Sequence, residues 1–266
     1  MPTANRANSS QSIIEPRRPH DDFSFEQLAA SYNFKLTSDR RRVFSRLVVK
    51  ECDQIEAPRR VLDIGCGRGI GRRLEYAHEI RRHIDDFWGI EPDQSVTPEE
   101  GLFDHFQHAL METAVLPEDH FDLAYSFMVM EHVADPESFM RSLHRSLRPG
   151  GVFLFMTPNG RHYFTRLAKL LHRLKVDELT LRFLKRTEAE DYQYPVQYRF
   201  NHASDIHSCV TPIGFDTPQF AYLEAEGPTS YFPGPLRPIL WMMNSKRRVI
   251  QSPRCLLTLT GRVTKS

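Results

Sequence analysis

The sequence predicts an α/β fold: a mostly parallel β-sheet with helices on both of its faces. Short apolar runs of strand length alternate along the chain with segments in which apolar residues recur at helical spacing. The first of these runs, residues 61–64, stops at a cluster of glycines and is followed by a predicted helix at 70–83. Strands that alternate with helices in this way are typical of βαβ units in a parallel sheet.

The composition describes a globular protein and argues against several other classes. The chain has 266 residues, of which 40% are hydrophobic and 11% aromatic, enough for one α/β domain with additions. Its net charge of +1 gives no overall field that would attract nucleic acid. No apolar run approaches the roughly 20 residues of a membrane-spanning helix, and the polar N-terminal residues do not resemble a secretion signal.

The cysteines indicate neither a zinc site nor a disulfide framework, because none of them forms a Cys-x-x-Cys pair. A reducing, cytoplasmic location is the simplest interpretation, and no metal site is expected. The cysteines are widely spaced, at Cys52, Cys66, Cys209 and Cys255.

Three regions are expected along the chain. Residues 1–22 are polar with little apolar content and are expected to be a disordered tail. Residues 23–57 carry apolar residues at helical spacing and are expected to form a helical cap, and residues 58–266 form the α/β domain. Tyr32 and the basic run at 40–42 either line the mouth of a substrate site or belong to a packing helix with a solvated face.

The glycine-rich turn after the first strand is the first candidate binding element. Gly65, Gly67 and Gly69 allow the backbone to bend sharply and a ligand to lie close against it. A dinucleotide fingerprint requires a third glycine where this chain has Ile70, and here Asp63 precedes the turn. An NAD(P)-dependent Rossmann oxidoreductase is therefore the less favoured enzyme class.

The segment from Asp63 to Gly69 resembles motif I of the class I S-adenosylmethionine-dependent methyltransferases. The resemblance implies S-adenosyl-L-methionine as the cofactor, with Gly65, Gly67 and Gly69 lying against it. It also implies that Asp63 orients the glycine loop or binds the amino group of the methionine moiety. Cys66 fits as a small turn residue in this cofactor site rather than as a nucleophile, because its surroundings offer little to stabilise a thiolate.

The second strand, at 86–90, ends in Glu91 and Pro92, about 20 residues after the glycine turn. In doubly wound folds an acidic side chain at this position binds the ribose hydroxyls of a nucleotide, because a carboxylate accepts two hydrogen bonds. The alternative is a surface acid at a strand end. With the motif before it, this segment places Glu91 and Pro92 in the expected cofactor site.

A third, weaker strand is expected at 106–111, with Glu112 and Thr113 directly after it and a Leu-Pro pair at 116–117. In the resembled family an acidic or polar residue at this position meets the adenine amino group. The resemblance therefore implies that Glu112 and Thr113 belong to the cofactor site.

The fourth strand, at 121–127, brings Phe127 to the edge where open α/β sheets place their ligands, and Phe127 joins the expected cofactor site. His132 lies just beyond this strand, and the near-neutral pKa of a histidine suits a general base. The alternative is that His132 caps or packs at the start of a helix predicted at 137–147. Glu131 beside it is either structural or orients the imidazole.

The run from Glu131 to Asn159 closely resembles the UbiG- and UbiE-like small-molecule methyltransferases. It contains an Asp-Pro helix start, an Arg-Pro-Gly-Gly turn and a fifth strand at 152–156. The resemblance implies a Rossmann-like sheet of seven strands, mostly parallel, with helices on both faces and an antiparallel last strand. It implies a small molecule or a glycan or lipid-linked intermediate as the acceptor, with O-methylation as the expected reaction.

An insertion is expected at about 161–201. Its residues 161–186 combine an apolar stripe with a basic face. This pattern suits a lid over the active site, a helix packed on the domain, or contact with an anionic membrane surface near a lipid-linked acceptor. Beyond the insertion a helix is expected at 203–212, a sixth strand near 220–224 and a final strand at 255–263.

Two further alternatives bear on function. A module that binds S-adenosylmethionine without catalysing methyl transfer would share the same cofactor motifs. Amino methylation of nucleic acid is disfavoured, because the Asn/Asp-Pro-Pro-aromatic motif of such enzymes is replaced here by Ser126-Phe127-Met128-Val129. No nucleic-acid partner is therefore expected.

Overall fold

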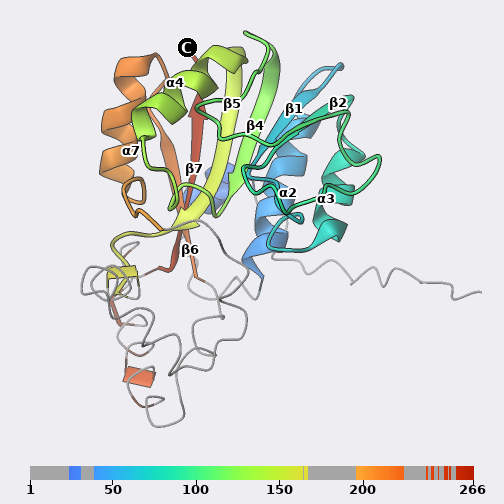
Figure 1. The fold of residues 1–266 in the computed structure, drawn as a ribbon. Coiled ribbons are helices and arrows are strands. Elements are labelled where there is room, and N and C mark those ends of the chain that lie inside the picture. Colours follow the sequence, from blue (N-terminus) through green and yellow to red (C-terminus); the bar gives the residue numbers. More distant parts are fainter. Residues whose placement is uncertain are drawn as a thin grey trace, which may run out of the picture.

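The computed structural model describes residues 24–30, 39–163, 165–166, 196–224 and 256–266, together with isolated residues between 238 and 252. Within these residues the chain forms a seven-stranded sheet flanked by helices (Figure 1). The predicted tail at 1–22, Tyr32 and nearly all of the predicted basic stretch at 161–186 lie outside the described residues.

The strands of the sheet lie in the order β3-β2-β1-β4-β5-β7-β6. Strands β1 to β5 run parallel, whereas β7 is antiparallel to both of its neighbours, β5 and β6. This confirms the predicted Rossmann-like sheet of seven mostly parallel strands with an antiparallel last strand. The strands are β1 (Arg60–Ile64), β2 (Asp86–Ile90), β3 (His105–Gln107), β4 (Phe121–Phe127), β5 (Leu147–Pro158), β6 (Gln219–Leu223) and β7 (Thr258–Thr264).

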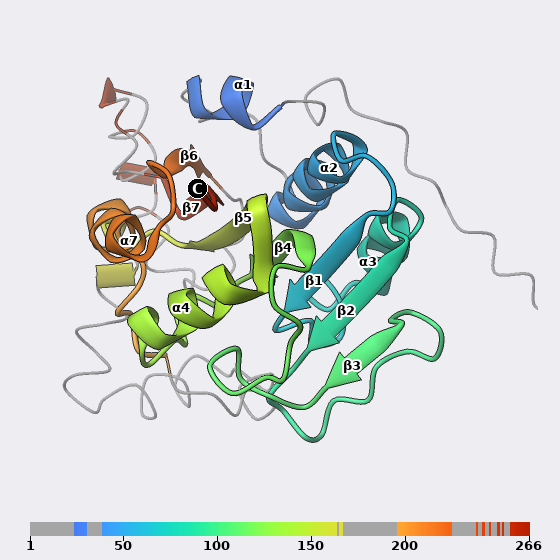
Figure 2. The ribbon, with the colours of Figure 1, turned by 90° about the horizontal axis from the view of Figure 1, so that it is seen from above.

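Helices cover both faces of the sheet, as Figure 2 shows from above. Helices α2 (Arg40–Asp53) and α3 (Leu74–Arg81) lie on one face, where α1 (Phe25–Ala30) joins the same hydrophobic core. Helices α4 (Pro136–Ser146) and α7 (Ala203–Val210) lie on the other face, over a second core. The central strands β1 and β4 therefore bury side chains in both directions, which is why they read as continuous apolar runs.

The region expected to be a helical cap forms α1 and α2. Helix α2 begins at the cap residue Asp39, whose side chain accepts a hydrogen bond from the N–H of Arg41. Its apolar side chains are buried against the sheet, and Phe44 and Val48 are fully buried there. Tyr76 of α3 donates a 3.0 Å hydrogen bond to Asp39, which ties the start of α2 to its neighbouring helix.

The start of α4 agrees closely with the expectation from the sequence. Asp135 accepts hydrogen bonds from both the N–H and the hydroxyl of Ser138, and Pro136 occupies the first turn. The cap therefore fixes where the loop after β4 ends. That loop, residues 128–135, lies at the edge of the sheet where the candidate site is built.

Two predicted boundaries were wrong near the site. Helix α3 begins at Leu74 rather than at residue 70, because Gly69, Gly71 and Arg72 have positive φ angles of 85°, 58° and 64° and cannot continue a right-handed helix. Strand β3 ends at Gln107 rather than at residue 111. The chain turns instead, and the N–H groups of Thr113 and Ala114 both donate to the carbonyl of Leu110.

The later elements lie close to their expected positions. The predicted helix at 203–212 is divided into α7 and a 3₁₀ turn, η3 (Thr211–Ile213), which contains a proline in its first turn and ends at Gly214 with a φ of 110°. Strands β6 and β7 each lie within three residues of the predicted bounds.

Candidate functional site

The candidate site lies at the carboxyl edge of the sheet, between β1 and β4. The strand order reverses there, since β2 and β3 lie to one side of β1 while β4 and β5 lie to the other. Loops that leave β1 and β4 must diverge at such a point, which opens a crevice for ligands. The glycine loop after β1 and the loop at 128–135 after β4 meet there, where Gly65 lies against Val129.

The glycine loop is held tightly against both neighbouring strands. The N–H groups of Gly65 and Cys66 donate to the carbonyl of Ile90, at 2.8 and 3.2 Å. Gly65 has a φ of 68°, and a Cβ atom at this position would lie 2.5 Å from Cγ2 of Val129. Only glycine therefore fits here, because the loop turns sharply directly against the segment that follows β4.

Gly67 and Glu91 link the loop to the end of β2. The N–H of Gly67 donates a 2.9 Å hydrogen bond to Oε2 of Glu91, and the N–H of Asp93 donates at 3.0 Å to Oε1. Glu91 is only 8% exposed. Burial raises the pKa of Glu91, whereas the two N–H donors and His108 act to lower it. The sequence placed Glu91 here, and the structure shows its carboxylate aimed at the loop.

Gly67 also leaves room for a ligand. A Cβ atom there would have only Oε2 of Glu91 and the carbonyl of Gly65 near it, at 3.7 and 3.9 Å. By contrast, a Cβ atom on Gly69 would meet the carbonyl oxygen of Arg73 at 2.8 Å. A side chain at Gly67 would therefore meet these atoms only at ordinary van der Waals distance, while Gly69 is required by the turn itself.

Asp63 lies beneath the loop, at the end of β1. It is 4% exposed, and the hydroxyl of Tyr125 donates a 2.9 Å hydrogen bond to its Oδ2 atom. Burial raises the pKa of Asp63 to about 8; the hydrogen bond from Tyr125 opposes this shift, and the carboxylate of Glu91 adds to it. Two carboxyl groups thus face one small region, where a cation would be stabilised.

Tyr125 is a contributor that sequence reasoning missed. The parallel register places it directly opposite Asp63, on β4. It is fully buried, and its hydroxyl needs a partner there. A tyrosine among the apolar residues of a buried strand was the available signal, although only the register identifies which carboxyl it meets.

Cys66 is buried between these acids. Burial raises the pKa of the Cys66 thiol strongly, and the carboxylates of Asp63 and Glu91 raise it further. The thiol therefore stays protonated and is a poor nucleophile. This agrees with its interpretation as a small turn residue.

The remaining expected cofactor residues lie on the same edge. Glu112 and Thr113 sit on the turn after β3; burial raises the pKa of Glu112, and Thr113 is exposed. Pro92 is partly buried at the end of β2. Phe127, at the end of β4, packs on Phe44 of α2 with ring centroids 5.4 Å apart.

His132 lies on the loop after β4 and is partly buried. The backbone N–H of His132 donates a 2.8 Å hydrogen bond to the carbonyl of Val129, the residue that lies against Gly65. Glu131 beside it is buried, with 6% of its surface exposed, and accepts a 3.1 Å hydrogen bond from the hydroxyl of Thr157 on β5. The structure thus brings the expected proton acceptor and a buried carboxyl to one loop.

The chemistry of this site fits S-adenosylmethionine. Its sulfonium and amino groups carry positive charge, which suits the buried carboxyls of Asp63 and Glu91. The open side of Gly67 allows an adenosyl group to lie against the backbone. Gly65, Gly67, Asp63 and Glu91 would hold the cofactor, and no cluster of three potential metal ligands occurs in the described residues.

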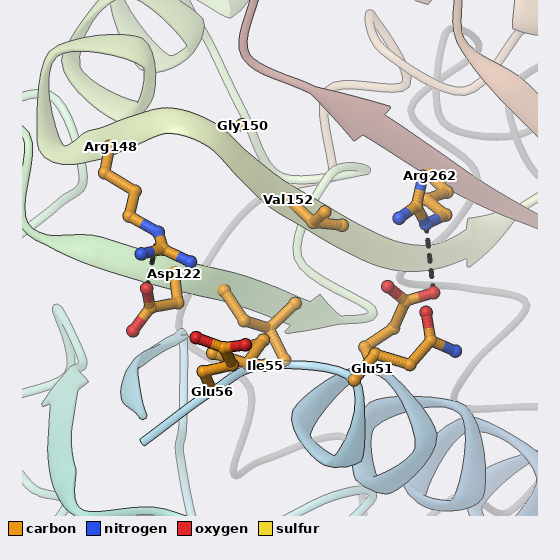
Figure 3. Close-up of a pocket in the computed structure, with 10 residues that line it drawn as sticks. Glu51, Ile55, Glu56, Asp122, Arg148, Gly150, Val152 and Arg262 are labelled. Atoms are coloured by element: carbon orange, nitrogen blue, oxygen red, sulfur yellow. Dashed lines mark hydrogen bonds and ion pairs between the residues drawn. The ribbon is translucent and has the colours of Figure 1, made fainter. Parts of the chain in front are cut away.

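A separate pocket of about 420 Å³ lies at the opposite, amino edge of the sheet (Figure 3). It lies between the end of α2 and the beginnings of β4 and β5, and two ion pairs, Arg148–Asp122 and Arg262–Glu51, cross it. None of its lining residues belongs to the carboxyl edge. It is therefore not the predicted cofactor site.

Among the described residues, no helix has the length and apolarity required to cross a membrane.

Comparisons with known proteins agree with this geometry. Residues 23–216 match the family model described as a methyltransferase domain, which is more than half of the chain. A probable S-adenosylmethionine-dependent methyltransferase of Mycolicibacterium smegmatis is 37% identical over 106 residues, covering 39% of each chain. A ubiquinone biosynthesis O-methyltransferase of Ruegeria pomeroyi is 31% identical over 107 residues, covering 38% of this chain and 41% of the relative.

The fold comparison reaches further along the chain. The crystal structure of the YcgJ protein of Bacillus subtilis has a TM-score of 0.55 at 18% identity, covering 83% of this chain and 97% of that one. At that identity the likeness concerns the fold alone. The two curated relatives are matched over only about two fifths of their own length, 39% and 41%.

Proposed function

This chain belongs to the class I S-adenosylmethionine-dependent methyltransferases, and from that premise we propose that it transfers a methyl group to a hydroxyl of a small molecule or of a glycan or lipid-linked intermediate. The observation that carries the proposal is the pair of buried carboxyls, Asp63 and Glu91, on the two sides of the glycine loop. Together they match the charge and the diol of the cofactor.

The chain's residues contribute orientation and electrostatics. The cofactor supplies the activated methyl group when it is bound. Glu91 would hold the ribose diol, Asp63 the cationic methionine end, and Glu112 the adenine amino group. Holding an acceptor in line with the methyl group contributes on the order of 7–11 kcal/mol to lowering the barrier. The remaining requirement is a group that takes the hydroxyl proton, for which His132 is the candidate from the sequence.

The proposed acceptor class is supported by the O-methyltransferases among the relatives. A lipid-linked acceptor would bring the protein to a membrane surface, for which the basic stretch at 161–186 is the proposed contact. We place the reaction in the cytoplasm, where the free thiols of Cys52, Cys66 and Cys209 would stay reduced.

Calorimetry with S-adenosylmethionine tests the cofactor assignment. Wild type is expected to bind, and both Asp63→Ala and Glu91→Ala are expected to bind at least tenfold more weakly, a change that corresponds to about 1.4 kcal/mol. Glu56→Ala is the matched control, because Glu56 is an exposed acid that lines the pocket at the opposite edge. The absence of wild-type binding at millimolar cofactor would falsify the proposal.

The main rival is a protein that binds the cofactor without transferring its methyl group. Incubation with methyl-labelled S-adenosylmethionine and a hydroxyl acceptor such as catechol separates the two, because only the enzyme forms labelled product. An NAD(P)-dependent oxidoreductase is separated by the same calorimetry with NADPH in place of S-adenosylmethionine, to which we expect no binding.

A further inference from the structure

One buried carboxyl at the carboxyl edge has no part in cofactor binding. Glu131 lies on the loop after β4, two residues beyond Val129, which lies against Gly65. Glu131 is buried, with 6% of its surface exposed. The cofactor residues Asp63 and Glu91 belong to β1 and β2, on the other side of the point where the strand order reverses. Glu131 is therefore on the half of the edge that is left for the acceptor.

A directed chain of hydrogen bonds orients the Glu131 carboxyl. The side-chain amide of Asn201 donates at 2.7 Å to Oγ1 of Thr157, and that hydroxyl donates at 3.1 Å to Oε2 of Glu131. The same amide also donates at 3.0 Å to the carbonyl of Pro158. Because the single hydroxyl proton of Thr157 points to Glu131, Oε2 is held as an acceptor.

The network keeps acceptor capacity for a further donor. Among the described residues no side chain donates to Oε1 of Glu131, although the backbone N–H of Glu131 forms a hydrogen bond with its own carboxylate. In the same part of the chain, the buried Oδ1 of Asn201 has no hydrogen-bond partner. Buried polar atoms are nearly always paired, so the unpaired Oδ1 of Asn201 favours a bound group that donates, such as a hydroxyl.

The segment from Gln197 to Asn201 is hydrogen-bonded to the loop that carries Glu131. The N–H groups of Gln197 and Tyr198 both donate to the carbonyl of Glu131, at 2.8 and 3.0 Å. Arg199 donates to the carbonyl of Ala134 at 3.0 Å. Tyr198 has a φ of 51°, a strained conformation for a residue with a side chain. These contacts fix residues 197–199 against the loop that carries Glu131.

The charged groups around Glu131 come from three elements. Arg40, at the start of α2, acts to lower the pKa of Glu131. Tyr198, from the segment at 197–201, has a pKa that burial raises and that the nearby charge of Glu131 raises further. His132 is the neighbour of Glu131 on the same loop. Burial raises the pKa of Glu131 to about 7, whereas the hydrogen bond from its own backbone N–H, the hydrogen bond from Thr157 and the charge of Arg40 act to lower it. A carboxyl with that pKa exchanges protons readily near neutral pH.

We propose that Glu131, oriented by Thr157 and Asn201, accepts the proton of the acceptor hydroxyl, in place of His132. This rests on the proposed methyl transfer to a hydroxyl. The oxygen of the acceptor forms a bond to the methyl carbon while the carbon–sulfur bond breaks, and its electron pair returns to sulfur. The hydroxyl proton passes to Oε1 of Glu131. Thr157 and Asn201 are positioning residues, because they act through the carboxyl.

Glu131→Gln and His132→Gln are compared as matched variants, with catechol as the probe acceptor and methyl-labelled S-adenosylmethionine. Glutamine keeps the size of the side chain and the hydrogen bond from Thr157. We expect Glu131→Gln to lose about 10²–10⁴-fold in rate and to lose the wild-type inflection near pH 7. His132→Gln is expected to keep that inflection in the pH profile. The reverse pattern would overturn the proposal.

Two measurements keep the test decisive. Calorimetry with S-adenosylmethionine is expected to give wild-type affinity for Glu131→Gln, and a loss of affinity would assign Glu131 to the cofactor site instead. If wild type binds the cofactor but does not methylate catechol, the proton on Glu131 is followed by infrared spectroscopy. The protonated carboxyl band that is missing in Glu131→Gln belongs to Glu131, and its intensity is titrated against pH. A midpoint near pH 7 that catechol lowers supports the proposal, and a midpoint below 5, or one that catechol leaves unchanged, refutes it.

Thr157 supplies the positioning control. Thr157→Val removes a hydrogen bond to the charged form of Glu131, so the inflection in rate is expected to move to higher pH rather than disappear. Thr157→Ser restores the hydroxyl and is expected to return the inflection to its wild-type position. An unchanged pH profile in Thr157→Val would show that the hydrogen bond has no influence on proton transfer.

Discussion

The N–H of Gly67 donates a 2.9 Å hydrogen bond to Oε2 of Glu91, across the gap between the loop after β1 and the end of β2. This contact joins the two motifs on which the cofactor assignment depends. It also keeps the Glu91 carboxylate at the edge of the sheet, where the N–H of Asp93 donates to its other oxygen. Two backbone donors therefore hold the carboxylate in place before any ligand binds.

Removal of the Glu91 carboxylate is expected to weaken cofactor binding more than it changes stability. Hydrogen bonds to a charged group contribute about 1.5–3 kcal/mol, so Glu91→Ala is expected to raise the Kd for S-adenosylmethionine by about 10–100-fold. Glu91→Gln keeps one acceptor oxygen, and its Kd for S-adenosylmethionine is expected to lie between those of wild type and Glu91→Ala. Calorimetry measures both, and an unchanged Kd in Glu91→Ala would remove Glu91 from the site.

Gly67→Ala tests whether the open side of the loop is the cradle. Gly67 has a φ of 49°, so alanine costs about 1–2 kcal/mol in stability, but the new Cβ atom meets no protein atom closer than 3.7 Å. We expect a folded protein whose affinity for S-adenosylmethionine falls by at least tenfold.

Gly101→Ala is the matched control for that variant. Gly101 also has a positive φ, 76°, and a Cβ atom added there would have no other atom within 4 Å, yet it is remote from the glycine loop in the chain. Urea denaturation is expected to show a similar loss of stability, and calorimetry an unchanged Kd. Equal losses of affinity in the two variants would mean that backbone strain, rather than the cradle, explains the effect.

Asp63→Asn is expected to stabilise the cofactor-free protein while it impairs cofactor binding. The folded protein retains a proton on Asp63 up to a pKa of about 8, whereas the ordinary value is 3.8. Between those values the folded state binds more protons than the unfolded state, so this group makes stability fall as pH rises.

Thermal or urea unfolding between pH 5 and 9 measures this effect. Asparagine keeps an acceptor for Tyr125 but carries no charge, so Asp63→Asn is expected to be about 1–3 kcal/mol more stable than wild type at pH 8.5, and similar to it at pH 5. A variant that is less stable than wild type at pH 8.5 would contradict the assignment of a costly buried charge.

Lys265 is expected to anchor the last strand. Its Nζ atom donates to Oδ1 of Asp119 at 2.6 Å and to the carbonyls of His144 and Leu147 at 2.8 and 2.7 Å. Lys265→Met leaves these acceptors without a donor, which is expected to cost about 2–4 kcal/mol of stability. Urea denaturation measures the loss, with Ser266→Ala as the control, and a loss below about 0.5 kcal/mol would contradict the anchor.

The sequence alone identified most of the sheet and the positions of the cofactor acids. Asp63 and Glu91 each end a short buried strand, and the rule that parallel strands end at one edge is enough to bring them together. The glycines mark where the backbone turns, because φ angles such as the 68° of Gly65 are costly for other residues. The alternation of strands and helices likewise predicted the fold class, since it reflects local patterning.

The third strand ends at Gln107 because the chain turns back on the carbonyl of Leu110, and of the apolar residues in that turn Met111 and Ala114 are buried whereas Leu110 is exposed. Helix α3 starts late because the turn extends through Arg72, whose φ of 64° no helical periodicity reveals.

What the sequence determined by itself was the class of fold, the family and the acids that mark the cofactor crevice, because each depends on residues that are near one another in the chain or on the common edge of parallel strands. What only the tertiary structure decided was the partnership of side chains: Tyr125 with Asp63, and Asn201 with Thr157 and Glu131. Those contacts join residues 26 to 62 positions apart. Their donors and acceptors meet only after register and packing have placed the strands, and no spacing in the sequence encodes that meeting.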